Sequence, residues 1–154
     1  MNRRSIRSFV GVAAVAGLFT GALGERSSAF AKTVGTVVFD IGGVESKRGG
    51  HVRCALYRSE ENWLGRTPYR ADATLARGRG VRCVFRNLPR GTYAIASLHD
   101  EDDDLEMDKT LGLPTEGYCM SRDAEDESLL KPAWNDARFR FRGGKARVTA
   151  TMNY

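Results

Sequence analysis

Short segments with alternating apolar residues, little helical periodicity and frequent turn signals predict an all-β fold. The segments "TVVFDI", "HVRCALY" and "VRCVF" place apolar residues at every second position, as half-buried strands do. Turns rich in Gly, Pro and Asn, such as "NLPRG", separate such segments. This combination is typical of an antiparallel β-sandwich, and we expect a single domain of immunoglobulin-like or transthyretin-like type.

The elements can be assigned in chain order from the same pattern. The expected strands cover residues 36–41, 51–57, 71–75, 81–85 and 92–99. Ser59 is suited to cap a short helical turn in "SEENWL". Residues 109–136 show no clear period. The segments "ARFRF" and "ARVTATM" predict a closing hairpin around Gly143 and Gly144.

Residues 1–31 differ from the rest of the chain and predict a secretory signal peptide. The basic start "NRRSIR" is followed by the apolar run "FVGVAAVAGLFTGAL" and by small residues in "SSAFAK". The run is shorter than the roughly 20 residues that cross a bilayer, which disfavours the alternative, an N-terminal membrane anchor. We expect cleavage after Ala31, with Gly24 as the second candidate, and a secreted or periplasmic domain over residues 32–154.

The charge of the chain changes when this segment is set aside. The whole chain has a formal net charge of +5, of which residues 1–31 carry +3, so the mature domain carries only +2. The basic character therefore belongs mostly to the targeting segment, and we expect no nucleic-acid partner. We also expect no integral membrane segment after cleavage. The basic outer face of "RFRFR" offers a contact for an anionic cell-envelope polymer or a protein, although such a face is more often only solvated.

Three cysteines lie in the mature domain, and an exported protein meets an oxidising compartment. Cys54 shares a strand face with Val52 and Leu56, and Cys83 shares one with its own apolar neighbours. A disulfide between Cys54 and Cys83 follows if the two strands are neighbours or face each other. The alternative is two buried free thiols. Cys119 remains as the unpaired cysteine.

The stretch "HDEDDDLEMD", residues 99–108, holds seven carboxylates. Their mutual repulsion needs compensation, and Ca²⁺ is bound by loops with acids at alternate positions. The predicted calcium ligands are Asp100, Asp102, Asp104 and Asp108. Leu105 stands where a calcium loop of this kind needs Gly, and Leu111 where it needs Glu, so a weak site is expected, with Glu116 or a carbonyl completing the shell. The alternative is a solvated acidic loop.

No motif predicts an enzyme. The sequence contains no G-x-S-x-G, H-E-x-x-H, phosphate-binding loop or dinucleotide fingerprint. We therefore expect a non-enzymatic binding or structural role with no catalytic residues. The alternative is a small extracytoplasmic hydrolase that uses carboxylates from loops within residues 99–127. We interpret His99 as a strand-end residue bonded to the following loop, not as a metal ligand. Cys119 with a distant His is only a weak signal for thiol catalysis.

Four aromatic residues fall in or near predicted loops: Trp63, Tyr69, Tyr118 and Trp134. Exposed loop aromatics can form a binding surface for a sugar or a peptide. The more frequent role is to cap an open end of a sandwich, which we expect here.

Several segments together carry a resemblance to a known family. The segments "HVRCALYRSEENW", "VRCVFRNLPRGTYAIASLHDEDDDLEMD", "LGLPTEGYCMS" and "PAWNDARFRF" resemble the bacterial domain-of-unknown-function family 2141. The resemblance implies a secreted β-sandwich and no established activity. Family members follow the HD pair with a stretch like "ENGNGKLD". The resemblance places the family's Asp and Asn side chains at the four predicted calcium ligands, and family glycines at Asp103, Leu105 and Cys119.

Overall fold

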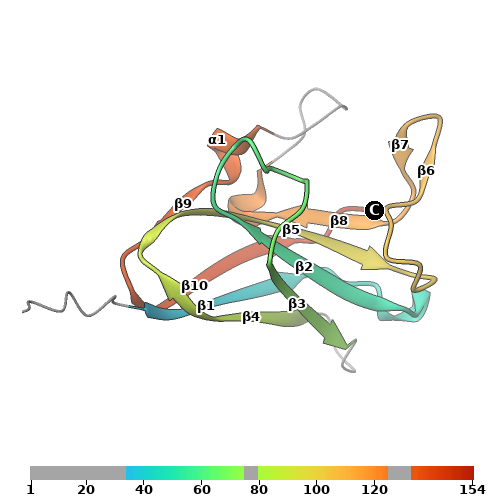
Figure 1. The fold of residues 1–154 in the computed structure, drawn as a ribbon. Helices are drawn as coiled ribbons and strands as arrows, with labels where there is room; N and C mark the ends of the chain where they lie inside the picture. The colour runs from blue at the N-terminus through green and yellow to red at the C-terminus, as the bar shows by residue number, and fades with distance from the viewer. Residues whose placement is uncertain (1–33, 75–79, 125–132) are drawn as a thin grey trace, which may run out of the picture. The chain divides into compact units, whose positions relative to one another are not determined.

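The computed structural model describes residues 34–74, 80–124 and 133–154, so the predicted signal peptide lies outside the described residues. Most of the described chain is strand, which confirms the all-β prediction (Figure 1). The strands are β1 Val34–Gly42, β2 His51–Tyr57, β3 Tyr69–Thr74, β4 Gly80–Pro89, β5 Gly91–Asp100, β6 Lys109–Thr110, β7 Leu113–Pro114, β8 Gly117–Met120, β9 Phe139–Phe141 and β10 Gly144–Thr151. The helical elements are η1 Ser46–Arg48, η2 Ser121–Asp123 and α1 Trp134–Ala137. None of the described helices is long and apolar enough to span a bilayer.

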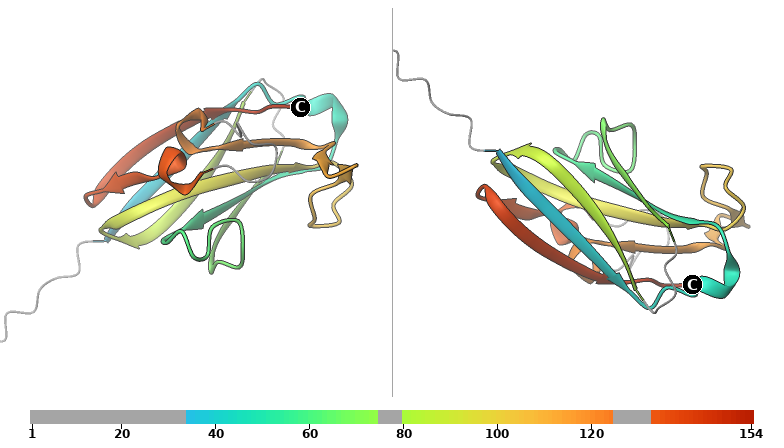
Figure 2. Two further views of the ribbon diagram at one scale, coloured as in Figure 1. Left: turned by 90° about the horizontal axis from the view of Figure 1, so that it is seen from above. Right: turned by 90° about the horizontal axis from the view of Figure 1, so that it is seen from below.

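The larger strands form two sheets. One has the order β10-β1-β4, and the other has the order β3-β2-β5-β8, with β9 also paired to β5. The short strands β6 and β7 form a hairpin of their own. In Figure 2 one sheet lies in front of the other: β2, β5 and β8 are nearer the viewer from above, and β1, β4 and β10 are nearer the viewer from below. The expectation of purely antiparallel pairing is wrong at one place, because β1 and β10 run parallel.

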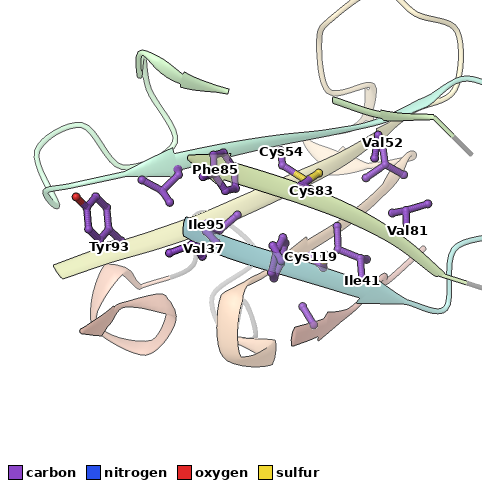
Figure 3. Close-up of a cluster of buried hydrophobic side chains, with 14 of the residues drawn as sticks. Val37, Ile41, Val52, Cys54, Val81, Cys83, Phe85, Tyr93, Ile95 and Cys119 are labelled. Atoms are coloured by element: carbon purple, nitrogen blue, oxygen red, sulfur yellow. A yellow bond between two sulfur atoms is a disulfide. The ribbon is translucent and has the colours of Figure 1, made fainter. Parts of the chain in front are cut away.

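The core lies between the two sheets and follows from the alternation in the sequence (Figure 3). Val52, Cys54 and Leu56 of β2 are each at most 2 % exposed, while the residues between them are half-buried. Cys54 and Cys83 form a disulfide with a Cα–Cα distance of 6.4 Å, which confirms the predicted pair. The bond joins β2 of one sheet to β4 of the other, and Cys119 is a buried free thiol.

A second apolar cluster covers part of the outer face of the β3-β2-β5-β8 sheet. Trp63, from the connection between β2 and β3, and Trp134 of α1 pack there with Tyr57 and Met120. The rings of Trp63 and Trp134 meet edge to face, with centroids 5.7 Å apart. These tryptophans therefore cover a sheet face. The sequence had led us to expect that they cap an open end of the sandwich.

The predicted hairpin around Gly143 and Gly144 is wrong. Phe139 and Phe141 of β9 pack beside Tyr93 in the sheet that contains β5, whereas β10 pairs with β1 in the other sheet. Both glycines have positive φ, 89° and 73°, a conformation that glycine adopts without a steric penalty. The pair therefore carries the chain from one sheet to the other, where a hairpin would have kept it in one.

Candidate functional site

The acidic loop begins at the end of β5, and its first carboxylate is the centre around which it curls. Asp100 is fully buried although it is ionisable. Its carboxylate oxygens accept hydrogen bonds from the backbone N–H of Asp104, at 3.1 Å, and of Leu105, at 3.2 Å. Arg53 of β2 donates to the same carboxylate through Nε. The loop therefore wraps around Asp100 and holds its carboxylate in place.

Two further carboxylates, both exposed, support the curl and lie near Asp100. Asp102 Oδ1 accepts from the backbone N–H of Asp104 at 3.3 Å, and Asp104 Oδ1 accepts from that of Glu106 at 2.7 Å. As a result Asp100, Asp102 and Asp104 each offer one oxygen within 4.8 Å of the others. Among the described residues, Asp108 is not part of this group, so the structure brings together three of the four predicted ligands.

Glu116 closes the loop at its base. Its side chain is 4 % exposed, and its two oxygens accept from the backbone N–H groups of Glu101, at 2.7 Å, and of Asp108, at 3.2 Å. The sequence offered Glu116 as a further calcium ligand. Instead it ties the first and last residues of the loop to the segment before β8, and both of its oxygens are already occupied by backbone donors.

The side chains of Arg53 and His51, both from β2, lie against the loop. Arg53 Nη2 donates to Asp103 Oδ1 at 2.9 Å, in addition to its bond with Asp100. His51 Nδ1 lies 2.5 Å from the same oxygen of Asp103. Strand register places His51 beside the start of the loop, because His51 is directly opposite Asp100 in the β2–β5 pair. The chain therefore supplies part of the positive charge that the acidic stretch requires, which the sequence analysis did not identify.

The surroundings of Asp100 set its charge. Burial disfavours the ionised carboxylate and by itself would raise the pKa of Asp100. The hydrogen bond and charge of Arg53, with the N–H groups of Leu105 and Asp104, outweigh burial and lower that pKa. Asp100 is consequently a fixed anion at neutral pH and has no proton to donate as a general acid.

His99 has a structural role, with partners other than the predicted one. It is fully buried, its Nε2 lies 2.8 Å from the carbonyl oxygen of Gly49, and its Nδ1 lies 2.6 Å from Tyr154 Oη. Since a carbonyl only accepts, Nε2 carries the proton and Nδ1 accepts from the tyrosine hydroxyl. Tyr154 Oη in turn accepts from the backbone N–H of Glu45 at 2.8 Å. Both ring nitrogens are therefore used, and neither bonds to the loop that follows β5.

Cys119 is unsuited to nucleophilic catalysis. Burial, followed by the nearby charge of Asp123, raises the pKa of its thiol to about 12, against a smaller opposing hydrogen bond with Ser97. The thiolate is the nucleophilic form of cysteine, and almost none is present at neutral pH with such a pKa.

The backbone of the acidic loop enters the left-handed region at two residues. Asp103 has φ 65° and Leu105 has φ 73°. For a residue other than glycine, and for Leu in particular, this region is sterically unfavourable. The loop path is therefore one that glycine would adopt more readily than the residues present.

A family model described as "Uncharacterized protein conserved in bacteria (DUF2141)" matches residues 40–149. The chain belongs to the DUF2141 family. The match covers the end of β1, all of β2 to β9 and most of β10, and it includes the disulfide and the whole acidic loop. No curated protein and no solved structure matches the sequence. The two left-handed residues, Asp103 and Leu105, are positions at which the resemblance implied family glycines.

Proposed function

We propose that the protein is a non-enzymatic extracytoplasmic β-sandwich, of immunoglobulin-like or transthyretin-like type, whose acidic loop binds Ca²⁺ and is stabilised by it. The observation that carries the proposal is the gathering of one oxygen each from Asp100, Asp102 and Asp104 within 4.8 Å. Ca²⁺ takes six to eight oxygen ligands, and three carboxylates with waters meet that demand. The loop is already curled by its own hydrogen bonds, so binding requires little ordering.

The charge balance of the loop supports a cation. Arg48 and Arg53 are the guanidinium groups that pair with loop acids, against seven carboxylates in residues 99–108. A large negative excess remains, and a divalent ion would reduce it. The positive charge of Arg53 next to Asp100 opposes that ion, as does Leu105 in place of a turn glycine. We therefore expect a weak site, with a Kd on the order of 10⁻⁴–10⁻³ M, the range of extracellular modules.

Two observations support the compartment and the absence of catalysis. The buried Cys54–Cys83 disulfide joins the two sheets and is the kind of bond that persists in an oxidising environment, in line with the signal-like residues 1–31. Glu116 accepts backbone N–H groups at both of its oxygens, and Asp100 is an anion paired with Arg53 that has no proton to donate. This weighs against the alternative of a hydrolase that uses these carboxylates.

The calcium proposal is tested by thermal unfolding with EDTA and with millimolar Ca²⁺. At a free Ca²⁺ concentration tenfold above Kd, binding to the folded state adds about 1.4 kcal/mol, which for a domain of this size raises Tm by about 6 °C. Replacing Asp102 and Asp104 together by Ala should abolish the rise. Glu106→Ala, an exposed acid outside the group, is the matched control and should retain it. An unchanged Tm with Ca²⁺ would identify the stretch as a solvated acidic loop.

Export is tested separately. Protein isolated from the native host should begin near Lys32, as read by N-terminal sequencing or intact mass. A mature chain that retains the apolar run of residues 9–23 would contradict export by signal cleavage.

A further inference from the structure

A groove lies on the outer face of the β3-β2-β5-β8 sheet, away from the core. Its volume is about 810 Å³, within the 300–1,000 Å³ range of small-molecule sites. Figure 1 shows that the connection from β2 to β3 and the β6–β7 hairpin rise on the same side of this sheet as α1. Residues of that connection and of that hairpin line the groove, together with residues of β2, β5 and β8.

The floor of the groove is apolar and hollow because of strand register. Ala55 of β2 lies opposite Ala96 of β5, and both line the groove. The next outward-facing pair is Leu98 of β5 with Tyr118 of β8, which are both half-buried and also line it. Two facing alanines leave a depression between larger neighbours. The cluster around Trp63 packs against Ala55, Ala96 and Tyr118 from one side, and these three residues, each half-buried, also line the groove.

The walls contain leucines in a strained conformation. Leu64 has φ 59° and Leu105 has φ 73°, and both line the groove. Their side chains are 40 % and 67 % exposed, so neither gains much burial in return for the unfavourable backbone. Residues held in such conformations cluster at active sites and ligand clamps, and an exposed leucine side chain offers apolar surface to a ligand. The leucines therefore point to an apolar body as the occupant.

Among the residues whose side chains the structure describes, the charged ones that line the groove are Arg53, Arg70 and Lys109. Arg53 is engaged by Asp100 and Asp103 of the acidic loop. Arg70 and Lys109 are exposed, and neither forms an ion pair within the described ranges of the chain. An apolar floor with cations at its edge complements a molecule that is apolar over most of its length and anionic at one end.

We propose that the groove on the outer face of the β3-β2-β5-β8 sheet binds a small amphipathic carboxylate, with its apolar body over Ala55 and Ala96 and its anionic group near Arg70 and Lys109. The groove is distinct from the carboxylate group of the acidic loop, and ligand binding does not depend on the calcium proposal. The two share Leu105 and Met107, which belong to the loop and line the groove, and Arg53, which lines the groove and pairs with Asp100 and Asp103.

The test is isothermal titration calorimetry of the protein with decanoate below its micellar concentration, in buffer with EDTA so that calcium has no part. Decyltrimethylammonium, which has the same chain and the opposite charge, is the ligand control. We expect decanoate to bind with one-to-one stoichiometry and decyltrimethylammonium to bind at least about tenfold more weakly, because Arg70 and Lys109 line the groove. Equal binding of the two, or no binding of decanoate, would overturn the proposal.

Variants locate the bound molecule. Ala96→Leu fills the hollow floor and should abolish binding, while Arg70→Glu should weaken it by about tenfold. Arg86→Glu, an exposed position on β4 in the other sheet, is the matched charge control and should bind as the wild type does. Circular dichroism and Tm establish that each variant is folded. If Ala96→Leu does not fold, Arg70→Glu and amide shifts of Leu98 on adding decanoate decide the question.

Two other results would also count against the groove as a small-molecule site. Undiminished decanoate affinity in both the Ala96→Leu and Arg70→Glu variants would place the ligand elsewhere. Binding to anionic phospholipid vesicles without binding of monomeric decanoate would assign the surface to a membrane, and the proposal as stated would be wrong.

Discussion

Reducing the Cys54–Cys83 disulfide should remove a large part of the stability of this domain. The two cysteines are 29 residues apart in sequence, so the bond closes a loop of that size in the unfolded chain. In the chain-entropy model, opening such a loop returns about 12 cal/mol/K to the unfolded state, which is about 3.6 kcal/mol at 25 °C. Typical domains have only about 5–15 kcal/mol in total. For a domain of this size the expected fall in Tm is about 14 °C.

The assay is guanidinium and thermal unfolding of the oxidised and the fully reduced protein, the second refolded and measured in a phosphine reductant. Reduction opens the bond without removing the sulfur atoms from the core, so it is a cleaner perturbation than Cys→Ala. Cys119→Ala is the matched control: since Cys119 is free, its variant should lose the same stability on reduction as the wild type does. Thiol titration of denatured, unreduced protein should find one thiol. Three thiols, or equal stability of both forms within about 1 kcal/mol, would refute the reasoning.

Two further predictions concern the acidic loop. Arg53→Met should cost about 3–5 kcal/mol at neutral pH, because it leaves the buried anion of Asp100 without its partner. The pKa of Asp100 is lowered in the folded state, so the stability that its ionised form contributes is present above the ordinary pKa of about 3.9 and is lost as pH falls. In urea unfolding from pH 7 to pH 3, the difference in unfolding free energy between wild type and variant should therefore shrink. A constant difference would contradict the role of Asp100. Leu105→Gly should stabilise the protein by about 0.5–1 kcal/mol in the absence of ligand, since it removes a left-handed leucine. Glu106→Gly is the control, because Glu106 lies outside the left-handed region; in urea unfolding it should destabilise the protein by a similar amount. A loss of stability in both variants would contradict the prediction and show that the loop tolerates no glycine.

Local periodicity was sufficient to predict much of the fold. β1, β2, β4 and β5 lie where alternation predicted strands, because each has one face in the core and one outside it. The same alternation placed Cys54 and Cys83 on inward faces, which made their disulfide predictable. It could not predict which strands pair. β10 was assigned to β9 because the two are adjacent in sequence and joined by glycines, yet its partner is β1, far away in the chain.

The acidic site shows the same division between local and long-range information. The spacing of Asp100, Asp102 and Asp104 was enough to predict that they gather, since this depends on a few residues of loop. The contributions of Arg53 and Glu116 depend on the register between β2 and β5 and on the course of the chain before β8. One clue was available: Arg53 lies between inward-facing residues of a predicted strand, so its outward position was already implied by alternation.

The placement of β1 between β4 and β10 has a consequence for the order of assembly. Asp40 of β1 pairs with Arg82 of β4 on one side and with Arg147 of β10 on the other, so both neighbouring strands are needed to complete the ion pairs of Asp40. The pairing of Gly35 with Gly144 brings together segments distant along the chain, which is a slow step in folding. If β1 pairs with β4 before β10 docks, the edge of β1 that pairs with β10 in the native protein is open to solvent. Such an edge is a template for pairing with another chain, so refolding at high protein concentration should form aggregates that the native protein does not.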